Sequence, residues 1–82
     1  MKIEKLFNIV SRVFDIPKSS ISLSNSPETI EKWDSFNGYI LLDEIENEFN
    51  VQFSLDETLE IKNIGDFKLL LEKQGILFDN EE

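Results

Sequence analysis

Apolar residues recur with helical spacing in three separate stretches of the chain, and this pattern is the strongest constraint on the fold. In residues 2–14, 35–49 and 63–74, spacings of three and four place apolar side chains on one face of a helix. Three amphipathic helices that share one core are therefore expected. The residues predicted to face inward are Ile3, Leu6, Phe7, Val10, Val13 and Phe14 in the first stretch and Ile64, Phe67, Leu70 and Leu71 in the last.

The connection between the first two helices is unusually long. Residues 15–33 are rich in Ser, Asn and Pro, and a loop of this length is expected to be either functional or tied to the core. Residues 17–20 can form one helical turn. Trp33 either closes the bottom of the core or lines a groove beside Ser35. The apolar residues that can pin the loop to the core are Ile16, Ile21, Leu23, Ile30 and Trp33.

A shorter connection joins the second and third stretches. Residues 50–55 alternate apolar and polar side chains, but a lone strand has no partner with which to form a sheet. We therefore expect a connector that buries Val51, Phe53 or Leu55, followed by a short helix over residues 56–61. The expected fold is all-α: a small four-helix bundle of three longer helices and one short helix, with a long loop between the first and second helices.

Length and composition agree with a single small domain. A chain of 82 residues suffices for one domain, which we expect over residues 1–78, followed by an acidic tail at 79–82. A hydrophobic content of 40% excludes disorder for the body of the chain. No apolar run is long enough to span a bilayer, and the start of the chain lacks the apolar region of a signal peptide. We therefore expect a cytoplasmic monomer.

Charge and absent residue types narrow the possible functions. The net charge of −9 argues against nucleic-acid binding, which needs clustered Lys and Arg, and favours partners with basic docking patches. The chain contains no Cys and no His, which excludes disulfides, thiolate metal sites and nucleophilic mechanisms with an imidazole base. The protein is therefore not expected to be an enzyme, and any acyl chemistry would need an added group to supply the reactive atom.

The helix expected over residues 35–49 has an apolar face. Asp34 or Ser35 can cap its start, because both side chains accept hydrogen bonds from the free N–H groups of a first helical turn. Gly38 lies in line with the apolar face. Glycine destabilises a helix by about 1 kcal/mol relative to Ala, so Gly38 suggests that another backbone approaches closely there. The inward residues are Leu41, Leu42, Ile45 and Phe49.

The outer face of the same helix mixes apolar and acidic side chains. Apolar groups among acids on an outer face are typical of a docking surface. In the alternative interpretation, the neighbouring loop covers the apolar groups. The candidate partner-binding residues on this face and its flanks are Phe36, Asn37, Tyr39, Ile40, Asp43, Glu44, Asn47 and Glu48.

Acidic residues between Trp33 and Ile61 have no basic residue among them. Such a face can steer the protein toward basic patches, which raises association rates and leaves binding salt-sensitive. The alternative is an acidic face that is simply solvated. The eight acids are Asp34, Asp43, Glu44, Glu46, Glu48, Asp56, Glu57 and Glu60.

The order of these elements, with the segment Trp33-Asp34-Ser35-Phe36-Asn37 at the head of an acidic helix, resembles the acyl carrier protein family. The resemblance runs from about Lys2 to Gly75 and is closer to discrete carriers of specialised pathways than to the fatty-acid synthesis carrier.

In that family, the Ser of an Asp-Ser-Leu motif carries 4′-phosphopantetheine, whose thiol holds acyl or aminoacyl groups as thioesters. Ser35 matches the attachment residue, Asp34 the acid before it, and Phe36 stands where Leu is usual. The partners implied are a phosphopantetheinyl transferase and enzymes that load and transfer the cargo.

The physical chemistry of the site agrees with this resemblance. Free N–H groups and a partial positive charge at a helix start favour a phosphodiester on Ser35, and a loop-to-helix junction is accessible to a modifying enzyme. One alternative is an unmodified acidic adaptor of the same fold that docks through Phe36, Ile40 and Asp43. A divalent-metal site has weak support, because the acids lack the spacing of a Ca²⁺ loop.

Overall fold

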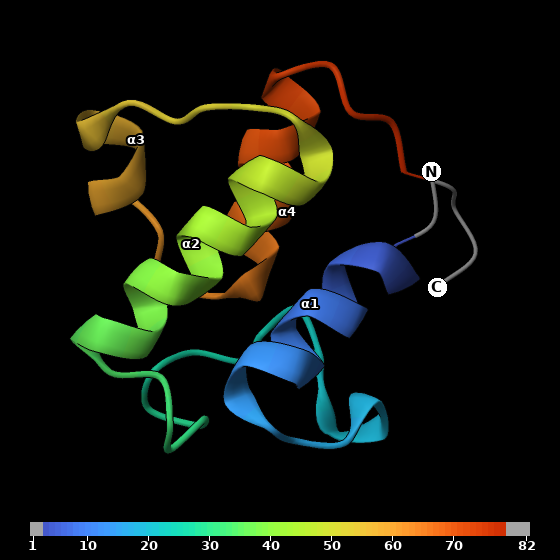
Figure 1. Ribbon diagram of the computed structural model, residues 1–82, viewed down its shortest axis with the longest axis vertical. Coiled ribbons are helices and arrows are strands. Elements are labelled where there is room, and N and C mark those ends of the chain that lie inside the picture. The colour runs from blue at the N-terminus through green and yellow to red at the C-terminus, as the bar shows by residue number, and fades with distance from the viewer. Residues whose placement is uncertain (1–2, 79–82) are drawn as a thin grey trace.

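The computed structural model describes residues 3–78, which contain four α-helices and no strand (Figure 1). The all-α helical bundle expected from the sequence is confirmed. The short helix lies close to its predicted position but begins and ends slightly earlier. The elements are α1 (Glu4–Phe14), the 3₁₀ turn η1 (Lys18–Ser20), α2 (Ser35–Phe49), α3 (Leu55–Leu59) and α4 (Ile64–Lys73).

Helices α1, α2 and α4 pack around one core, and the faces that meet are those the apolar spacing predicts. The sequence pattern missed Ile9, which is buried in α1, while Phe7 and Val13 are only partly buried. Each buried side chain of this size stabilises the fold by about 1.5–3 kcal/mol. The helical core residues are Leu6, Ile9, Val10 and Phe14 of α1, Leu41, Ile45 and Phe49 of α2, and Ile64, Phe67, Leu70 and Leu71 of α4.

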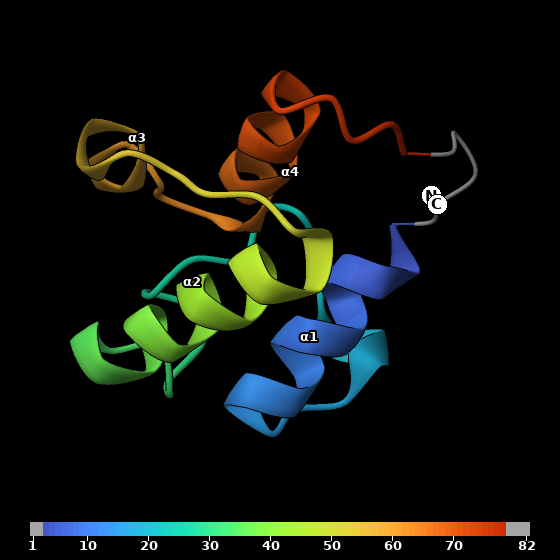
Figure 2. The same ribbon diagram turned by 45° about the horizontal axis from the view of Figure 1, so that its top comes forward.

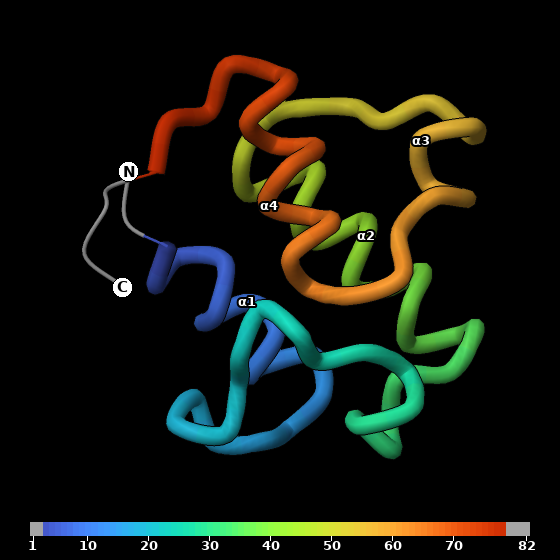
Figure 3. Tube along the Cα trace, turned by 180° about the vertical axis from the view of Figure 1, so that it is seen from behind, coloured from blue at the N-terminus to red at the C-terminus, as the bar shows by residue number. Residues whose placement is uncertain are grey.

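The long loop between α1 and α2 is held against the core, as expected. Ile21 and Ile30 are buried, and the loop also receives the start of α4 (Figure 3). The Ile64 N–H donates to the Asn25 carbonyl at 3.0 Å and the Gly65 N–H donates to the Leu23 carbonyl at 2.7 Å. The loop thereby satisfies donors that a helix start leaves unpaired.

Gly65 leaves room for this close approach of backbone to backbone. A Cβ at position 65 would lie 3.2 Å from the Leu23 carbonyl oxygen and 3.2 Å from Oδ1 of Asn63. Asn63 itself caps α4, because Oδ1 accepts from the Asp66 N–H at 2.8 Å. The beginning of α4 is therefore determined by both its own cap and a distant loop.

Helices α1, α2 and α4 are followed by residues with a left-handed backbone, whereas Glu60 after α3 is right-handed. Asp15 after α1 and Asn50 after α2 have φ values of 56° and 57°, and Gly75 after α4 has φ 98°. Such a residue is a common helix terminator. The chain then turns back, with the Ile76 N–H donating to the Leu71 carbonyl at 3.0 Å. The expected acidic tail, residues 79–82, lies outside the described residues.

Helix α3 sits at the side of the bundle, beside α2 and away from α1 (Figure 2). None of its residues is buried. Of the three candidate residues in the connector, Phe53 is buried, Val51 is half-buried and Leu55 is exposed. The connector is also held by Glu46 of α2, whose Oε2 accepts from the Phe53 N–H at 2.8 Å.

No helix within residues 3–78 has the length and apolar character needed to cross a membrane.

Candidate functional site

Ser35 is the first residue of α2, and its side chain does not cap the helix. Asp34 is the cap, since its Oδ1 accepts from the Asn37 N–H at 2.8 Å. Ser35 is exposed, and within residues 3–78 its hydroxyl has no hydrogen-bond partner. Of the two capping residues that the sequence allows, Asp34 therefore does the capping and leaves the Ser35 hydroxyl available for other chemistry.

Trp33 serves both roles considered for it. Its indole lies between two core aromatic rings, with ring centroids 5.4 Å from Phe14 and 6.3 Å from Phe67. The same side chain is only partly buried and contributes to the wall of a pocket that includes Ser35. Trp33 thus closes the core on one side and lines a groove on the other.

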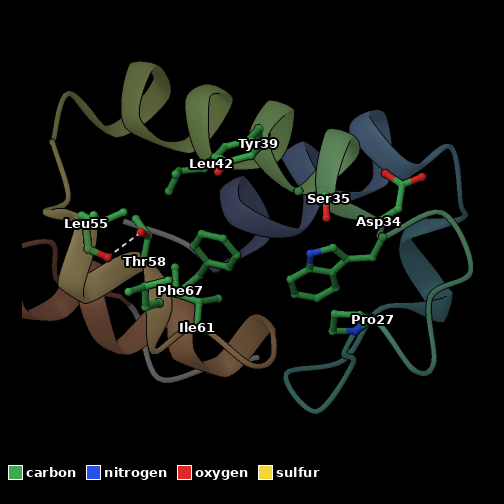
Figure 4. Close-up of a pocket in the computed structure, with 12 residues that line it drawn as sticks. Pro27, Asp34, Ser35, Tyr39, Leu42, Leu55, Thr58, Ile61 and Phe67 are labelled. Atoms are coloured by element: carbon green, nitrogen blue, oxygen red, sulfur yellow. Dashed lines mark hydrogen bonds between the residues drawn. The ribbon is translucent and has the colours of Figure 1, made fainter.

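The pocket has a volume of about 510 Å³ and lies between α2, α3 and the end of the long loop. Figure 4 shows the Ser35 hydroxyl directed toward this pocket, with Leu55 and Thr58 at its far end. The Thr58 hydroxyl already has a hydrogen-bond partner within α3, because it donates to the Leu55 carbonyl at 2.7 Å. The lining residues are Asp34, Ser35, Gly38, Tyr39 and Leu42 around α2, Leu55, Thr58, Leu59 and Ile61 around α3, and Pro27, Trp33 and Phe67.

Gly38 makes room for an aromatic side chain, which corrects the expectation that a backbone approaches there. A Cβ at position 38 would lie 3.3 Å from Nε1 and 3.5 Å from Cδ1 of Trp33. Trp33 lies five positions before Gly38 in the sequence. The end of the long loop folds its indole back against the first turns of α2. The prediction of a close approach at Gly38 is confirmed, but the prediction that a backbone makes this approach is wrong.

The outer face of α2 is open to solvent. The exposed fractions are 72% for Phe36, 73% for Tyr39 and 36% for Ile40, so the interpretation in which a neighbouring loop covers them is wrong. Asp43 and Asn47 are also exposed, and the Asn47 amide lies 3.4 Å from the Asp43 carboxylate. Asn37 is partly buried and donates to the Lys32 carbonyl at 2.8 Å, so it fastens the loop to α2.

Several acids between Trp33 and Ile61 have partners in the structure that the sequence does not indicate. Glu44 pairs with Arg12 at 2.9 Å and Glu48 with Lys5 at 3.7 Å, so basic residues of α1 reach the acids that have none nearby in sequence. These pairs are solvent-exposed, and each is worth only about 0–1 kcal/mol. Asp34 caps α2, Glu46 holds the connector and Glu57 caps α3. Within residues 3–78, Glu44 and Glu48 are therefore the two of the eight acids with a basic partner, and Asp43, Asp56 and Glu60 have neither a basic partner nor a hydrogen bond to the backbone.

The structure divides the predicted site residues into three groups. Asp34, Ser35 and Tyr39 line the pocket. The open outer face holds Phe36, Ile40, Asp43 and Asn47, whereas Glu44, Glu48 and Asn37 are engaged by α1 or the loop.

Sequence reasoning missed the α3 side of the pocket. Leu55 and Leu59 lie four residues apart in a helix of five residues, and such a short helix has little surface with which to bury both. That pattern was the available signal.

No protein-family model matches this sequence, and no curated protein shows significant similarity to it. Within the part of the chain that the structure describes, no group of three or more Asp or Glu side chains is arranged to hold a metal ion.

Proposed function

We propose that this protein is a discrete carrier that holds an acyl or aminoacyl group as a thioester on a 4′-phosphopantetheine arm attached to Ser35. The observation that carries the proposal is the Ser35 hydroxyl itself. It is exposed and unpaired within the described residues, stands at the first position of a 15-residue helix and opens onto a pocket lined by both apolar and polar side chains.

The residues around Ser35 fit the proposed group chemically. The first turn of α2 offers the amides of Ser35 and Phe36, which have no acceptor among residues 3–78, and a helix start favours an anion such as a phosphodiester. Asp34 caps the helix without using the Ser35 oxygen. The arm would supply the thiol that the chain lacks, and the protein would supply position and recognition.

Delivery of the cargo would rely on the outer face of α2. Phe36, Tyr39 and Ile40 provide exposed apolar area next to Ser35, and Asp43 adds a negative charge that no basic residue of the described chain neutralises. We propose that these residues contact partner enzymes with basic docking patches, the modifying transferase included. Complementary charges raise the association rate more than the affinity, which suits a carrier that visits several enzymes.

Intact mass tests the attachment. The protein is incubated with coenzyme A, Mg²⁺ and a broad-specificity phosphopantetheinyl transferase, in parallel with Ser35→Ala and with Ser20→Ala as a matched exposed serine. We expect the wild type and Ser20→Ala to gain the mass of one arm and Ser35→Ala to gain none. Because Asp34 supplies the cap, Ser35→Ala should retain the helix, which circular dichroism verifies.

An unmodified acidic adaptor is the second candidate function. It is favoured by the exposed cluster of Phe36, Tyr39 and Ile40, which needs no modification to act as a docking surface. Failure of the folded wild-type protein to gain mass with several transferases would favour the adaptor and reduce Ser35 to a helix-start residue.

A further inference from the structure

We propose that Trp33 is a positioning residue for the group on Ser35: its indole N–H donates a hydrogen bond to an oxygen of the arm near the attachment point. The inference rests on the proposed function and adds to it a residue that sets where the arm lies. It starts from a polar group that the packing of the core leaves unused.

The indole N–H of Trp33 is a donor without a partner among residues 3–78. Trp33 uses its backbone N–H, which donates to the Ile30 carbonyl at 3.0 Å, but Nε1 has no acceptor among residues 3–78. The described part of the chain contains no side-chain nitrogen or oxygen that is both buried and unpaired. Nε1 is therefore reached by solvent, although the rest of the ring packs between Phe14 and Phe67.

The chemistry of the pocket makes this donor selective for an oxygen acceptor. Among the described side chains that line the pocket, Trp33 carries the one nitrogen donor, and an indole nitrogen donates but does not accept. The hydroxyl of Thr58 is already engaged with a backbone carbonyl. A phosphodiester oxygen or an amide carbonyl oxygen of the arm is the type of group that such a donor holds.

The donor is also within reach of Ser35. Nε1 lies 3.3 Å from the Cβ that an alanine would place at position 38, and side chains three residues apart on a helix have Cβ atoms about 5–6 Å apart. Nε1 is therefore at most about 9 Å from the Cβ of Ser35. The absence of a side chain at Gly38 also keeps the donor accessible, because a side chain at this position would crowd Nε1.

The indole ring is held firmly, so the donor is pre-positioned. Two aromatic contacts and the adjacent Ile30–Trp33 backbone bond restrict its movement, which lowers the entropic cost of the hydrogen bond. A mobile arm would thereby gain a preferred direction along the pocket.

The test follows the indole N–H signal in ¹⁵N-labelled protein before and after Ser35 is modified. The chain has one Trp, so one indole signal reports on this group alone, and intact mass verifies each state. We expect a downfield shift of the indole proton after modification and about fivefold slower exchange with water, the factor that corresponds to about 1 kcal/mol for one hydrogen bond. An indole signal with the same shift and exchange rate in both states would overturn the inference while the proposed function stood. Absence of the mass gain would overturn both.

Two variants sharpen the result. Trp33→Phe keeps an aromatic ring in the core and removes the donor, so the arm signals should narrow relative to modified wild type as the arm becomes more mobile. Gly38→Ala should still be modified, but its indole signal should respond less than that of the wild type. Unchanged arm signals in Trp33→Phe, together with a full indole response in Gly38→Ala, would contradict the assigned role.

The ³¹P signal of the modified protein identifies the acceptor. A change of this signal in Trp33→Phe indicates the phosphodiester, and no change alongside narrowed arm signals indicates a carbonyl.

Discussion

Helices α3 and α4 follow each other in the chain and begin in similar ways, but they depend on different forces. Ser54 and Glu57 form a reciprocal capping box at α3, and Asn63 caps α4. Helix α4 buries four side chains, whereas α3 buries none. Capping is therefore enough to position a helix turn, but the packing of an apolar face is what makes a helix part of the core.

The difference leaves α3 available for another role. Leu55 and Leu59 are both mostly exposed and both line the pocket beside Ser35. Residues that contribute little to the core can change with less cost in stability. This region is therefore where the shape of the pocket is expected to be adjustable, while α4 maintains the fold.

The largest expected contrast comes from one chemical change made in each helix. Leu71 of α4 is 0% exposed and Leu59 of α3 is 71% exposed. We expect Leu71→Ala to lower the free energy of unfolding by about 2–5 kcal/mol and Leu59→Ala to change it by about 0.5 kcal/mol or less. Urea denaturation of both variants measures this, and equal losses would mean that α3 belongs to the core.

The next effect concerns the loop that holds the start of α4. Gly65→Ala places a methyl group 3.2 Å from the Leu23 carbonyl, so either the Gly65–Leu23 hydrogen bond lengthens or the loop shifts. We expect a loss of about 1–3 kcal/mol in the free energy of unfolding. Gly38→Ala is the matched control, since its new methyl group meets a side chain rather than a backbone carbonyl. A loss at Gly38 as large as that at Gly65 would show that the backbone contact is not the cause.

Removal of the caps should separate local from global stability. We expect Asn63→Ala to cost about 1 kcal/mol of global stability, because α4 is part of the core. Ser54→Ala should instead raise the hydrogen-exchange rates of the α3 amides with little change in the global unfolding midpoint. Exchange measured by NMR in both variants makes the comparison. A large fall in the midpoint for Ser54→Ala would indicate that α3 and the core unfold together.

Added salt should have the smallest effect on stability and should stabilise α3 more than the other helices. The net charge of −9 destabilises the compact state by self-repulsion, and Asp56 and Glu60 near α3 have no basic partner among the described residues. Moderate salt should raise the melting temperature slightly and slow exchange in α3 more than in α4. The exposed ion pairs weaken at the same time, but each contributes little. A melting temperature that falls with salt would show that these pairs outweigh the repulsion.

Much of the fold follows from local pattern. The spacing of apolar residues predicts α1, α2 and α4 closely, and Gly75 marks the end of α4 because its φ of 98° favours glycine. Of the candidate site, the accessible position of Ser35 follows from its place at a loop-to-helix junction, and helical periodicity places Phe36 on the outer face. Whether a loop covers that face was left open by the sequence. These features depend on residues a few positions apart, and such interactions are readable in a single sequence.

The remaining features depend on segments that are distant in sequence. No local pattern indicates that Lys5 and Arg12 reach Glu48 and Glu44 across the α1–α2 contact. The sequence of α2 therefore suggests more unpaired acidic side chains than the structure contains. The close neighbour of Gly38 likewise could not be identified, because its identity depends on how the long loop returns to α2.

The sequence by itself determined the helical class, the approximate boundaries of the three longer helices and the placement of Ser35 at the head of α2, because helix formation and capping are governed by neighbouring residues. Only the tertiary structure decided that the Trp33 indole lies against Gly38 in the wall of the pocket and that α3 supplies another wall. Those features depend on which surfaces meet when the core forms. The physical reason is that apolar burial is non-directional: the pattern states which faces are buried, and the packing of the whole chain selects their partners.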